Sequence, residues 1–311
     1  MTAPSEFLAS PPAGLSRATL WAIGGVALCA AIWGTTWYAI TLQLPAADPV
    51  ASVTYRFALA SLTLFAFCLL RGHKIGLTRI QHLAVFGQGV LTFSIQYSMV
   101  YEAERHVASA VVAVIFAGLA FANLVLFRLL LGQKASWRAW LGAALGVAGV
   151  AALFIAELRR TDASPEAVFG LVIALIAMVI AAAGNLAAWK AQKEGAPVLP
   201  ALAWAMGYGA GLVALYGLVT GIDWSFDPTL SYIGSLLYLS LFGSVIAFAL
   251  YFALARAKGY ALASYISALT PPVAMLVSVV FEDARFGWEA ALGLLLVLAG
   301  QILLIRAPKT A

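Results

Sequence analysis

The chain has 311 residues, of which 63% are hydrophobic and only 10% are charged, and its formal net charge is +5. Soluble domains carry about 25% charged residues, so this composition excludes an ordinary soluble protein and indicates a membrane protein. The basic residues are spread over short segments between apolar runs. This distribution excludes the concentrated basic patch of a nucleic-acid-binding protein.

Uncharged apolar runs of about 20 residues recur along the chain, and each is long enough for an α-helix to cross roughly 30 Å of hydrocarbon. None shows the period-two alternation of a transmembrane β-strand, which excludes a β-barrel. The first run is too long for the apolar core of a signal peptide, so we interpret it as a retained helix. The sequence therefore predicts an all-α membrane protein with ten transmembrane helices, at residues 20–42, 50–70, 81–101, 108–127, 137–156, 168–189, 198–219, 230–254, 260–281 and 287–305.

The distribution of Lys and Arg predicts an orientation in the membrane. With the amino terminus in the cytoplasm, thirteen of these residues fall on the inner side, four fall on the outer side, and Arg56 lies within a span. This asymmetry satisfies the positive-inside rule, so both termini are predicted to be cytoplasmic. Residues 1–19 are expected to form a disordered cytoplasmic tail and residues 306–311 a second cytoplasmic tail. No cofactor and no metal site is predicted.

The two halves of the chain resemble each other. The segment QKASWRAWLGAALGVAG (133–149) matches ARFGWEAALGLLLVLAG (284–300) at an offset of 151, which aligns Gly142 with Gly293 and Gly149 with Gly300. Because each half holds five predicted spans, an odd number, the second half must cross the membrane in the opposite sense to the first. We therefore predict two inverted-topology repeats, residues 20–156 and 168–305, an arrangement typical of transporters with a central site.

Three short motifs carry a resemblance to a known family: WGTTW (33–37), YRFALASL (55–62) and LGQKASWRAWLGAALG (131–146). Together with the duplication, they resemble the EamA-type members of the drug/metabolite transporter superfamily, and among these the bacterial aromatic amino-acid exporters of the YddG type. The resemblance implies a bacterial inner-membrane protein in which the first four helices of each half surround a central cavity, with the fifth and tenth outside. Family members commonly end the fourth helix of each half with Gly-Glu, whereas this chain has Gly132-Gln133 and Glu282-Asp283.

The fifth and tenth spans contain almost no polar residue, as expected of helices outside a cavity. In the fifth span, Gly142 and Gly146 form a small-xxx-small pair that permits close helix approach. Packing within one chain is the favoured interpretation of this pair, and a dimer contact is the alternative. The protein is expected to be a monomer, with a dimer possible.

Polar and aromatic residues at helical spacing mark a candidate binding cavity. Gln88, Thr92 and Gln96 recur every four residues and predict one polar stripe, which should face the bundle interior or water rather than lipid. A cavity walled by aromatic rings, amides and hydroxyls suits an aromatic or apolar ligand with a few polar groups. For each aromatic residue alone, core packing or a place in the interfacial belt is the alternative. The predicted substrate-binding residues are Trp33, Thr36, Trp37, Arg56, Gln88, Thr92, Gln96, Tyr97, Phe116, Asn123, Asn185, Trp204, Tyr208, Tyr265 and Ser267.

Arg56 is the single basic residue within a predicted span, where a charge is costly unless it is paired or reaches water. One interpretation makes it a clamp for the carboxylate of an amino acid, since a guanidinium binds a carboxylate through two hydrogen bonds. The other, which we favour, is structural: Arg56 ties its helix to carbonyl groups of a neighbour.

No Asp, Glu or His lies in the middle of a predicted span, and no buried acid pair is evident. Proton-coupled transporters usually carry such a residue, so transport is expected to be facilitated, uncoupled or unconventionally coupled. The missing nucleophile, acid pair and metal ligands disfavour an enzyme, and a receptor would not explain the duplication. The sequence predicts an exporter of amino acids, aromatic or large neutral ones, that works by alternating access. Export of other small metabolites or drugs is the alternative.

Overall fold

The computed structural model describes residues 17–258 and 260–307, and within this part of the chain the regular elements are all helices. They are α1 (Arg17–Thr41), α2 (Pro49–Leu70), α3 (Arg79–Gln88), η1 (Gly89–Gln96), α4 (Tyr97–Ala103), α5 (Ser109–Ala117), α6 (Leu119–Leu131), α7 (Trp137–Arg160), α8 (Pro165–Lys193), α9 (Val198–Thr220), α10 (Leu230–Leu237), η2 (Tyr238–Ile246), α11 (Ala247–Lys258), α12 (Tyr260–Phe281) and α13 (Trp288–Arg306). The segments η1 and η2 are π-helical.

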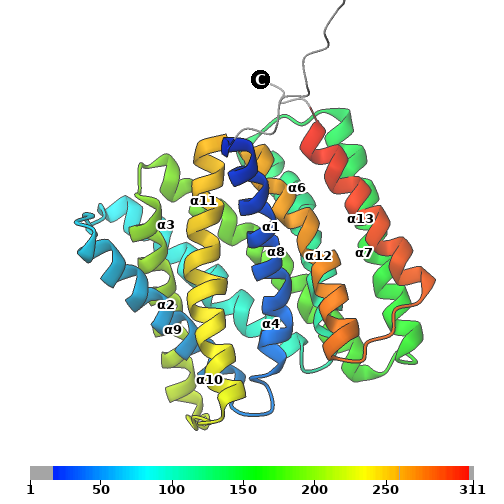
Figure 1. Ribbon diagram of the computed structural model, residues 1–311, viewed down its shortest axis with the longest axis horizontal. Helices are drawn as coiled ribbons and strands as arrows, with labels where there is room; N and C mark the ends of the chain where they lie inside the picture. Colours follow the sequence, from blue (N-terminus) through cyan, green and yellow to red (C-terminus); the bar gives the residue numbers. More distant parts are fainter. Residues whose placement is uncertain (1–16, 259, 308–311) are drawn as a thin grey trace, which may run out of the picture.

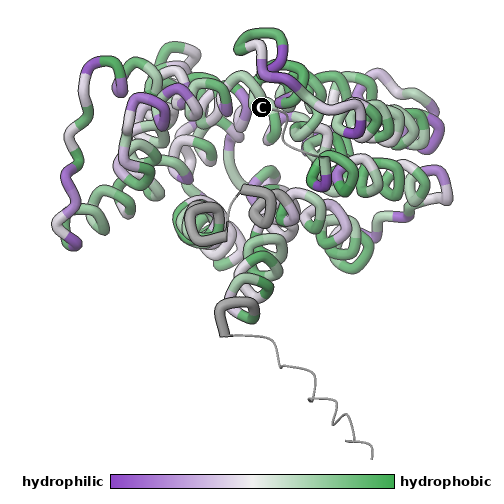
Figure 2. Tube along the Cα trace, turned by 90° about the horizontal axis from the view of Figure 1, so that it is seen from above, coloured by the Kyte–Doolittle hydropathy of each residue, from purple (hydrophilic) through white to green (hydrophobic). Residues whose placement is uncertain are grey.

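Nine helical stretches of the described chain are long and apolar enough to span a membrane, and they correspond to nine of the ten predicted spans. The remaining prediction, residues 260–281, coincides with α12, whose described apolar stretch, Tyr265–Phe281, is shorter. Figure 2 shows that hydrophobic residues dominate the helices, whereas hydrophilic residues gather in the connecting segments. The predicted tails fall outside the described residues at 1–16 and 308–311, and α1 begins at Arg17, inside the tail predicted for 1–19.

Local capping signals set where several helices begin. The carboxylate of Asp48 accepts a hydrogen bond from the Val50 backbone N–H at 2.8 Å, and Pro49 occupies the first turn of α2. Thr78 and Gln81 form a reciprocal capping box at the start of α3. Ser164 caps α8 in the same way as Asp48 caps α2, again with a proline in the first turn. These caps satisfy backbone N–H groups that would otherwise lack partners.

The π-helical segment η1 contains two residues of the predicted polar stripe, Thr92 and Gln96, and Gln88 directly precedes it. Gln96 is buried, whereas Gln88 and Thr92 are half-buried. The π-helix bonds i to i+5 rather than i to i+4, so this part of the third helical stretch has a wider turn than an α-helix.

Helices α7 and α13 lie side by side at one edge of the bundle (Figure 1), and glycines bring their backbones together. A β-carbon on Gly142 would lie 2.6 Å from the Gly300 carbonyl oxygen, closer than real β-carbons approach such an atom. Gly146 packs under the ring of Phe121 in the same chain. The prediction that these glycines serve packing within one chain is therefore confirmed.

The loops fall into two groups, which we name by their place. The Glu104 end comprises the loops at 42–48, 104–108, 161–164, 221–229 and 282–287. One cavity draws on residues of three of these loops, and a second joins Asp48, Glu102 and Ile222. The terminal end comprises the loops at 71–78, 132–136 and 194–197, with Arg17 and Ala307 at the limits of the described chain.

Candidate functional site

Arg56 lies in the amino-terminal half of α2 and is almost fully buried, with 2% of its surface exposed. Its guanidinium carbon is 4.7 Å from the centre of the Tyr97 ring and 5.0 Å from that of Phe57. Its Nε donates a long hydrogen bond of 3.4 Å to Ser244 Oγ, and its Nη1 has no hydrogen-bond partner among the described residues. A desolvated cation–π contact stabilises by about 2 kcal/mol. Arg56 is thus held by ring faces while part of its donor capacity stays unused.

A continuous series of aromatic contacts leads from α1 to this guanidinium. Successive ring centres are 5.2, 6.3, 5.1 and 4.7 Å apart. The rings follow in the order Trp33, Phe248, Phe93, Phe57 and Tyr97. Edge-to-face geometry dominates the series, which is the arrangement that ring quadrupoles favour. The rings come from α1, α2, η1, α4 and α11, so elements distant in sequence converge here.

Helix α1 meets η2 at Gly243, beside Arg56. The Trp33 indole N–H donates to the Gly243 carbonyl at 3.0 Å. A β-carbon on Gly243 would lie 2.8 Å from Thr36 Cγ2 and 3.7 Å from Arg56 Nη2, so these side chains share one small space. Trp37 packs on Phe116 of α5 at 5.3 Å between ring centres. The structure therefore gathers Trp33, Thr36, Arg56 and Tyr97 and joins Trp37 to Phe116.

Trp204 and Tyr208 belong to a different place, the terminal end. Their rings stack at 5.6 Å, and the Trp204 indole donates to the carbonyl of Ile75 in the 71–78 loop at 2.9 Å. The Tyr208 hydroxyl lies 2.9 Å from His82 Nδ1. Sequence analysis missed His82, whose place in the first turn of α3 gives no sign of a tyrosine partner on α9.

The other predicted residues are dispersed. Asn185 of α8 donates to Asn123 of α6 at 3.2 Å, and Thr92 Oγ1 is buried against Gly184 of α8 without a hydrogen-bond partner among the described residues. Gln96 is buried, Gln88 is half-buried, Tyr265 packs beside α1 and α11, and Ser267 is exposed. The predicted set thus marks a central group and a terminal group, with several residues in neither.

Glu104 is the important residue that sequence analysis missed, a buried carboxylate at the end of α4. Only 6% of its surface is exposed, and neither carboxylate oxygen accepts a hydrogen bond from the described residues. It interacts electrostatically with Glu282 and Arg56. Burial, followed by repulsion from Glu282, raises the pKa of Glu104 well above its usual range, while Arg56 opposes that shift. The sequence offered no signal, because Glu102 and Glu104 have the same charged neighbours along the chain. In the structure, Glu102 pairs with Arg105 and His106.

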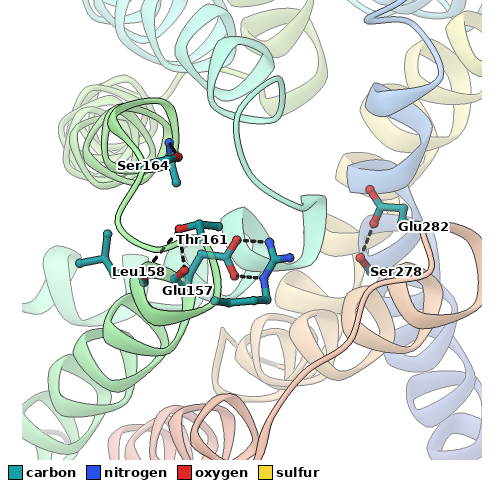
Figure 3. A network of polar contacts seen from close by, with 8 residues as sticks. Glu157, Leu158, Thr161, Ser164, Ser278 and Glu282 are labelled. Carbon is teal, nitrogen blue, oxygen red and sulfur yellow. Dashed lines mark hydrogen bonds and ion pairs between the residues drawn. The ribbon is translucent and has the colours of Figure 1, made fainter.

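The carboxylate of Glu282 accepts hydrogen bonds from two serine hydroxyls. Ser109 Oγ, at the start of α5, donates to Glu282 Oε2 at 2.6 Å, and Ser278 Oγ donates to the same oxygen. Figure 3 shows Glu282 beside Ser278, apart from a second polar group around Glu157 of α7 and Thr161, the residue that follows this helix. Glu157 is also buried, but Arg160 neutralises it through two hydrogen bonds of 2.5 and 2.8 Å. Glu104 therefore differs from Glu157 in lacking a directly bonded cation.

Glu104 and Glu282 line a cavity of about 850 Å³ at the Glu104 end. Its other charged or titratable lining residues are Arg105, His106, Arg160, Asp283 and Arg285. The cavity is therefore lined by both signs of charge, and one of its glutamates, Glu104, interacts with the buried Arg56.

In the part of the chain that the structure describes, the regular elements are helices, and nine stretches are long and apolar enough to span a membrane around a buried polar centre, which defines a multi-pass integral membrane protein. The chain belongs to the EamA-like transporter family, whose model matches residues 20–155 and again residues 168–306. It is thus a membrane transporter, which implies a small-molecule substrate and a lipid bilayer around it. Its relatives support an inner-membrane location.

The chain is 30% identical over 249 residues to the uncharacterized inner membrane transporter YedA of Escherichia coli, which covers 79% of this chain and 78% of that protein. It is 27% identical to protein PagO of Salmonella typhimurium, over 82% of each chain. It is 22% identical to an uncharacterized transporter of Archaeoglobus fulgidus, over 90% of this chain and 97% of that protein. A solved crystal structure superposes with a TM-score of 0.66 at 19% identity, over 94% of this chain and 98% of the other, and supports the fold.

Proposed function

We propose that this transporter exports amino acids, aromatic or large neutral ones, by alternating access through the centre of the helical bundle. The observation that carries the proposal is the aromatic series that ends on the buried Arg56 guanidinium, whose Nη1 has no hydrogen-bond partner among the residues that the structure describes. Rings fit an aromatic or large apolar side chain, and a guanidinium fits the carboxylate that every amino acid brings.

The proposed architecture is ten transmembrane helices in two inverted five-helix units, residues 20–156 and 168–305. The family model matches the chain twice, with boundaries close to these units. The π-helical segments support it as well, since η1 and η2 interrupt the third helical stretch of each unit. The helix neighbours agree: α1 packs on α12, and its counterpart α8 packs on α5 and α6. Alternating access then follows from rocking one unit against the other.

The proposed orientation puts the terminal end in the cytoplasm, together with both chain termini. Positive residues support it, because four basic residues belong to the Glu104 end and the terminal end holds the large majority. The Glu104 end then faces the outside of the inner membrane. Monomer is the state we propose, since the glycine pair of α7 is already used within the chain.

We assign the fifteen predicted binding residues to three parts of the pathway. Trp33, Thr36, Arg56 and Tyr97, with Trp37 and Phe116 beside them, form the central substrate site. The Trp204, Tyr208 and His82 group lies at the terminal end and closes the cytoplasmic side. The remaining residues, Gln88, Thr92, Gln96, Asn123, Asn185, Tyr265 and Ser267, line the route between these parts.

Transport by purified protein in vesicles tests the proposal. Vesicles loaded with unlabelled phenylalanine should take up labelled phenylalanine, and tryptophan, tyrosine and leucine should compete better than glycine or aspartate. If no amino acid competes while an unrelated drug is transported, the substrate proposal is wrong and the drug-export alternative replaces it.

The two interpretations of Arg56 are separated by comparing phenylalanine with phenylalaninamide, which lacks the carboxylate. A charge-assisted hydrogen bond contributes about 1.5–3 kcal/mol, so a clamp predicts a tenfold to hundredfold loss of phenylalanine affinity in Arg56→Gln. Phenylalaninamide affinity should change little. Arg128→Gln, an exposed arginine at the terminal end, is the control. Equal losses for both compounds, with reduced folded yield, would show that Arg56 is structural.

A further inference from the structure

The carboxylates of Glu104 and Glu282 lie at the Glu104 end, where the surroundings of one of them disfavour its ionised form. Glu104 is withdrawn from water, without a hydrogen-bond donor among the described residues, and within electrostatic range of Glu282. Glu282 already has the Ser109 and Ser278 hydroxyls as donors. Between two neighbouring carboxylates, the proton resides on the one with fewer donors and less water, because donors and water stabilise the ionised form. That residue is Glu104.

The groups that face Glu104 come from several elements. Arg56 of α2 attracts its ionised form, Glu282 after α12 repels it, and both act on it directly. Tyr101, one turn earlier on α4, donates its hydroxyl to Gln43 and so does not neutralise Glu104. The rim of the cavity adds Arg105, His106, Arg160, Asp283 and Arg285. Arg160 is bonded to Glu157, and Arg105 and His106 are bonded to Glu102.

The pair adjoins a water-accessible space, because Glu104 and Glu282 both line the 850 Å³ cavity at the Glu104 end. A cavity of this size also admits a small organic cation, since binding pockets for small molecules begin at about 300 Å³. An ammonium group has three N–H donors and one positive charge, which are the two things that ionised Glu104 lacks. The same site therefore suits a proton or an ammonium group, but not both together.

We propose that Glu104 and Glu282 form a proton-binding site, and that the ammonium group of an amine-bearing substrate displaces its proton. In this exchange the O–H bond of the Glu104 carboxyl breaks, the proton leaves through the cavity to solvent, and ammonium N–H groups donate to the two carboxylates. Substrate and proton then occupy the site alternately, which couples outward movement of one to inward movement of the other. The displacement step rests on the proposed function, whereas the proton site does not.

The proton site is tested on purified protein without substrate, by infrared difference spectroscopy across pH. The wild type should show the C=O band of a protonated carboxylic acid that persists well above the pH range in which glutamate ordinarily ionises. Glu104→Gln should remove that band, and Glu282→Gln should shift its titration to lower pH because the neighbouring charge is gone. Glu102→Gln, in the last turn of α4 just before Glu104, should leave the band unchanged. A wild type without the band at neutral pH overturns the proposal.

The displacement is tested by proton release, measured with a pH indicator in weakly buffered detergent solution when phenylalanine is added. Wild type and Glu102→Gln should release protons, and Glu104→Gln should release none. Phenylpropionate, which has the ring and the carboxylate but no ammonium, should release none from any variant. Release by phenylpropionate, or undiminished release by Glu104→Gln, would overturn the exchange. If phenylalanine fails to bind at all while the infrared band titrates as expected, the proposed substrate is wrong and the proton site stands.

The glutamine variants are chosen so that folding does not confuse the result. Glutamine has the shape of a protonated glutamic acid and no charge, so Glu104→Gln reproduces the protonated site. In vesicles, a pH gradient of one unit should concentrate phenylalanine about tenfold for wild type if one proton exchanges for one substrate. Glu104→Gln should equilibrate phenylalanine without concentrating it, and equal accumulation by both would contradict the coupling.

Discussion

Gly149 of α7 and Gly293 of α13 face each other so closely that each would strike the other's carbonyl oxygen if it carried a β-carbon, at 2.6 and 2.8 Å. Gly142 meets Gly300 in the same manner farther along the two helices. The repeat offset aligns Gly142 with Gly293 and Gly149 with Gly300. Exchanging each glycine for its aligned counterpart therefore turns one of these two contacts into the other. This reciprocity is what a two-fold axis between the two proposed inverted units would produce.

Gly149→Ala should destabilise the protein by about 1–3 kcal/mol, because the added methyl group has no room between the two backbones. Gly211→Ala of α9 is the matched control, since nothing lies within 4 Å of a β-carbon there. In the control, alanine's better helix propensity should be neutral or slightly stabilising. Thermal unfolding of the two variants in detergent measures the difference, and equal melting temperatures would contradict the close approach.

Tyr208→Phe should lower the free energy of unfolding by about 1 kcal/mol, because it removes the hydroxyl that meets His82 and keeps the ring that stacks on Trp204. Tyr216→Phe is the control, since that tyrosine is exposed on the same helix. Chemical denaturation of both variants, followed by tryptophan fluorescence, gives the comparison. A larger loss for the control would show that the hydroxyl pair contributes nothing.

Glu104 should make stability fall as pH rises. Its pKa in the folded protein is raised, so the folded state holds a proton that the unfolded chain releases above the ordinary glutamate value of 4.5. Protonated Glu104 therefore contributes its full stability below that value, and the contribution declines until pH passes the raised pKa. Melting temperatures of wild type should decline through this window, and Glu104→Gln should lack that part of the decline.

Cysteine labelling of intact cells checks the orientation. Asp162→Cys in the 161–164 loop should react with a membrane-impermeant maleimide added outside, whereas Lys134→Cys in the 132–136 loop should react only after the membrane is opened. The native Cys29 and Cys68 are buried, so the background should be low. The opposite pattern would place the terminal end outside and reverse the direction proposed for transport.

The helices were predictable because hydrocarbon leaves the backbone no partner but itself, and length and apolar composition therefore decide their existence. Helical spacing predicted that Trp33 and Thr36 share a face, whereas their meeting with Arg56 and Tyr97 is a tertiary feature. Glu104 was not predictable, because a loop carboxylate beside Arg105 and His106 has the composition of a solvated surface. Only the inward path of the 104–108 loop, a tertiary feature, separates it from Glu102.

The distinction between central and terminal residues was also beyond the sequence. Trp204 and Tyr208 have the same aromatic and helical pattern as Trp33 and Trp37, and periodicity records which face a residue occupies, not how deep it lies. Depth came from partners far along the chain, namely Ile75 for Trp204 and Gly243 for Trp33.

The π-helical segments η1 and η2 give the two helices that contain them a choice of register. Each widened turn holds one residue more than an α-turn would, so its conversion to α-geometry would swing the side chains beyond it by about 100° around the helix axis. Tyr97, whose ring covers the guanidinium of Arg56, is the first residue after η1. A rearrangement of that one turn would therefore rotate this ring away from the charge.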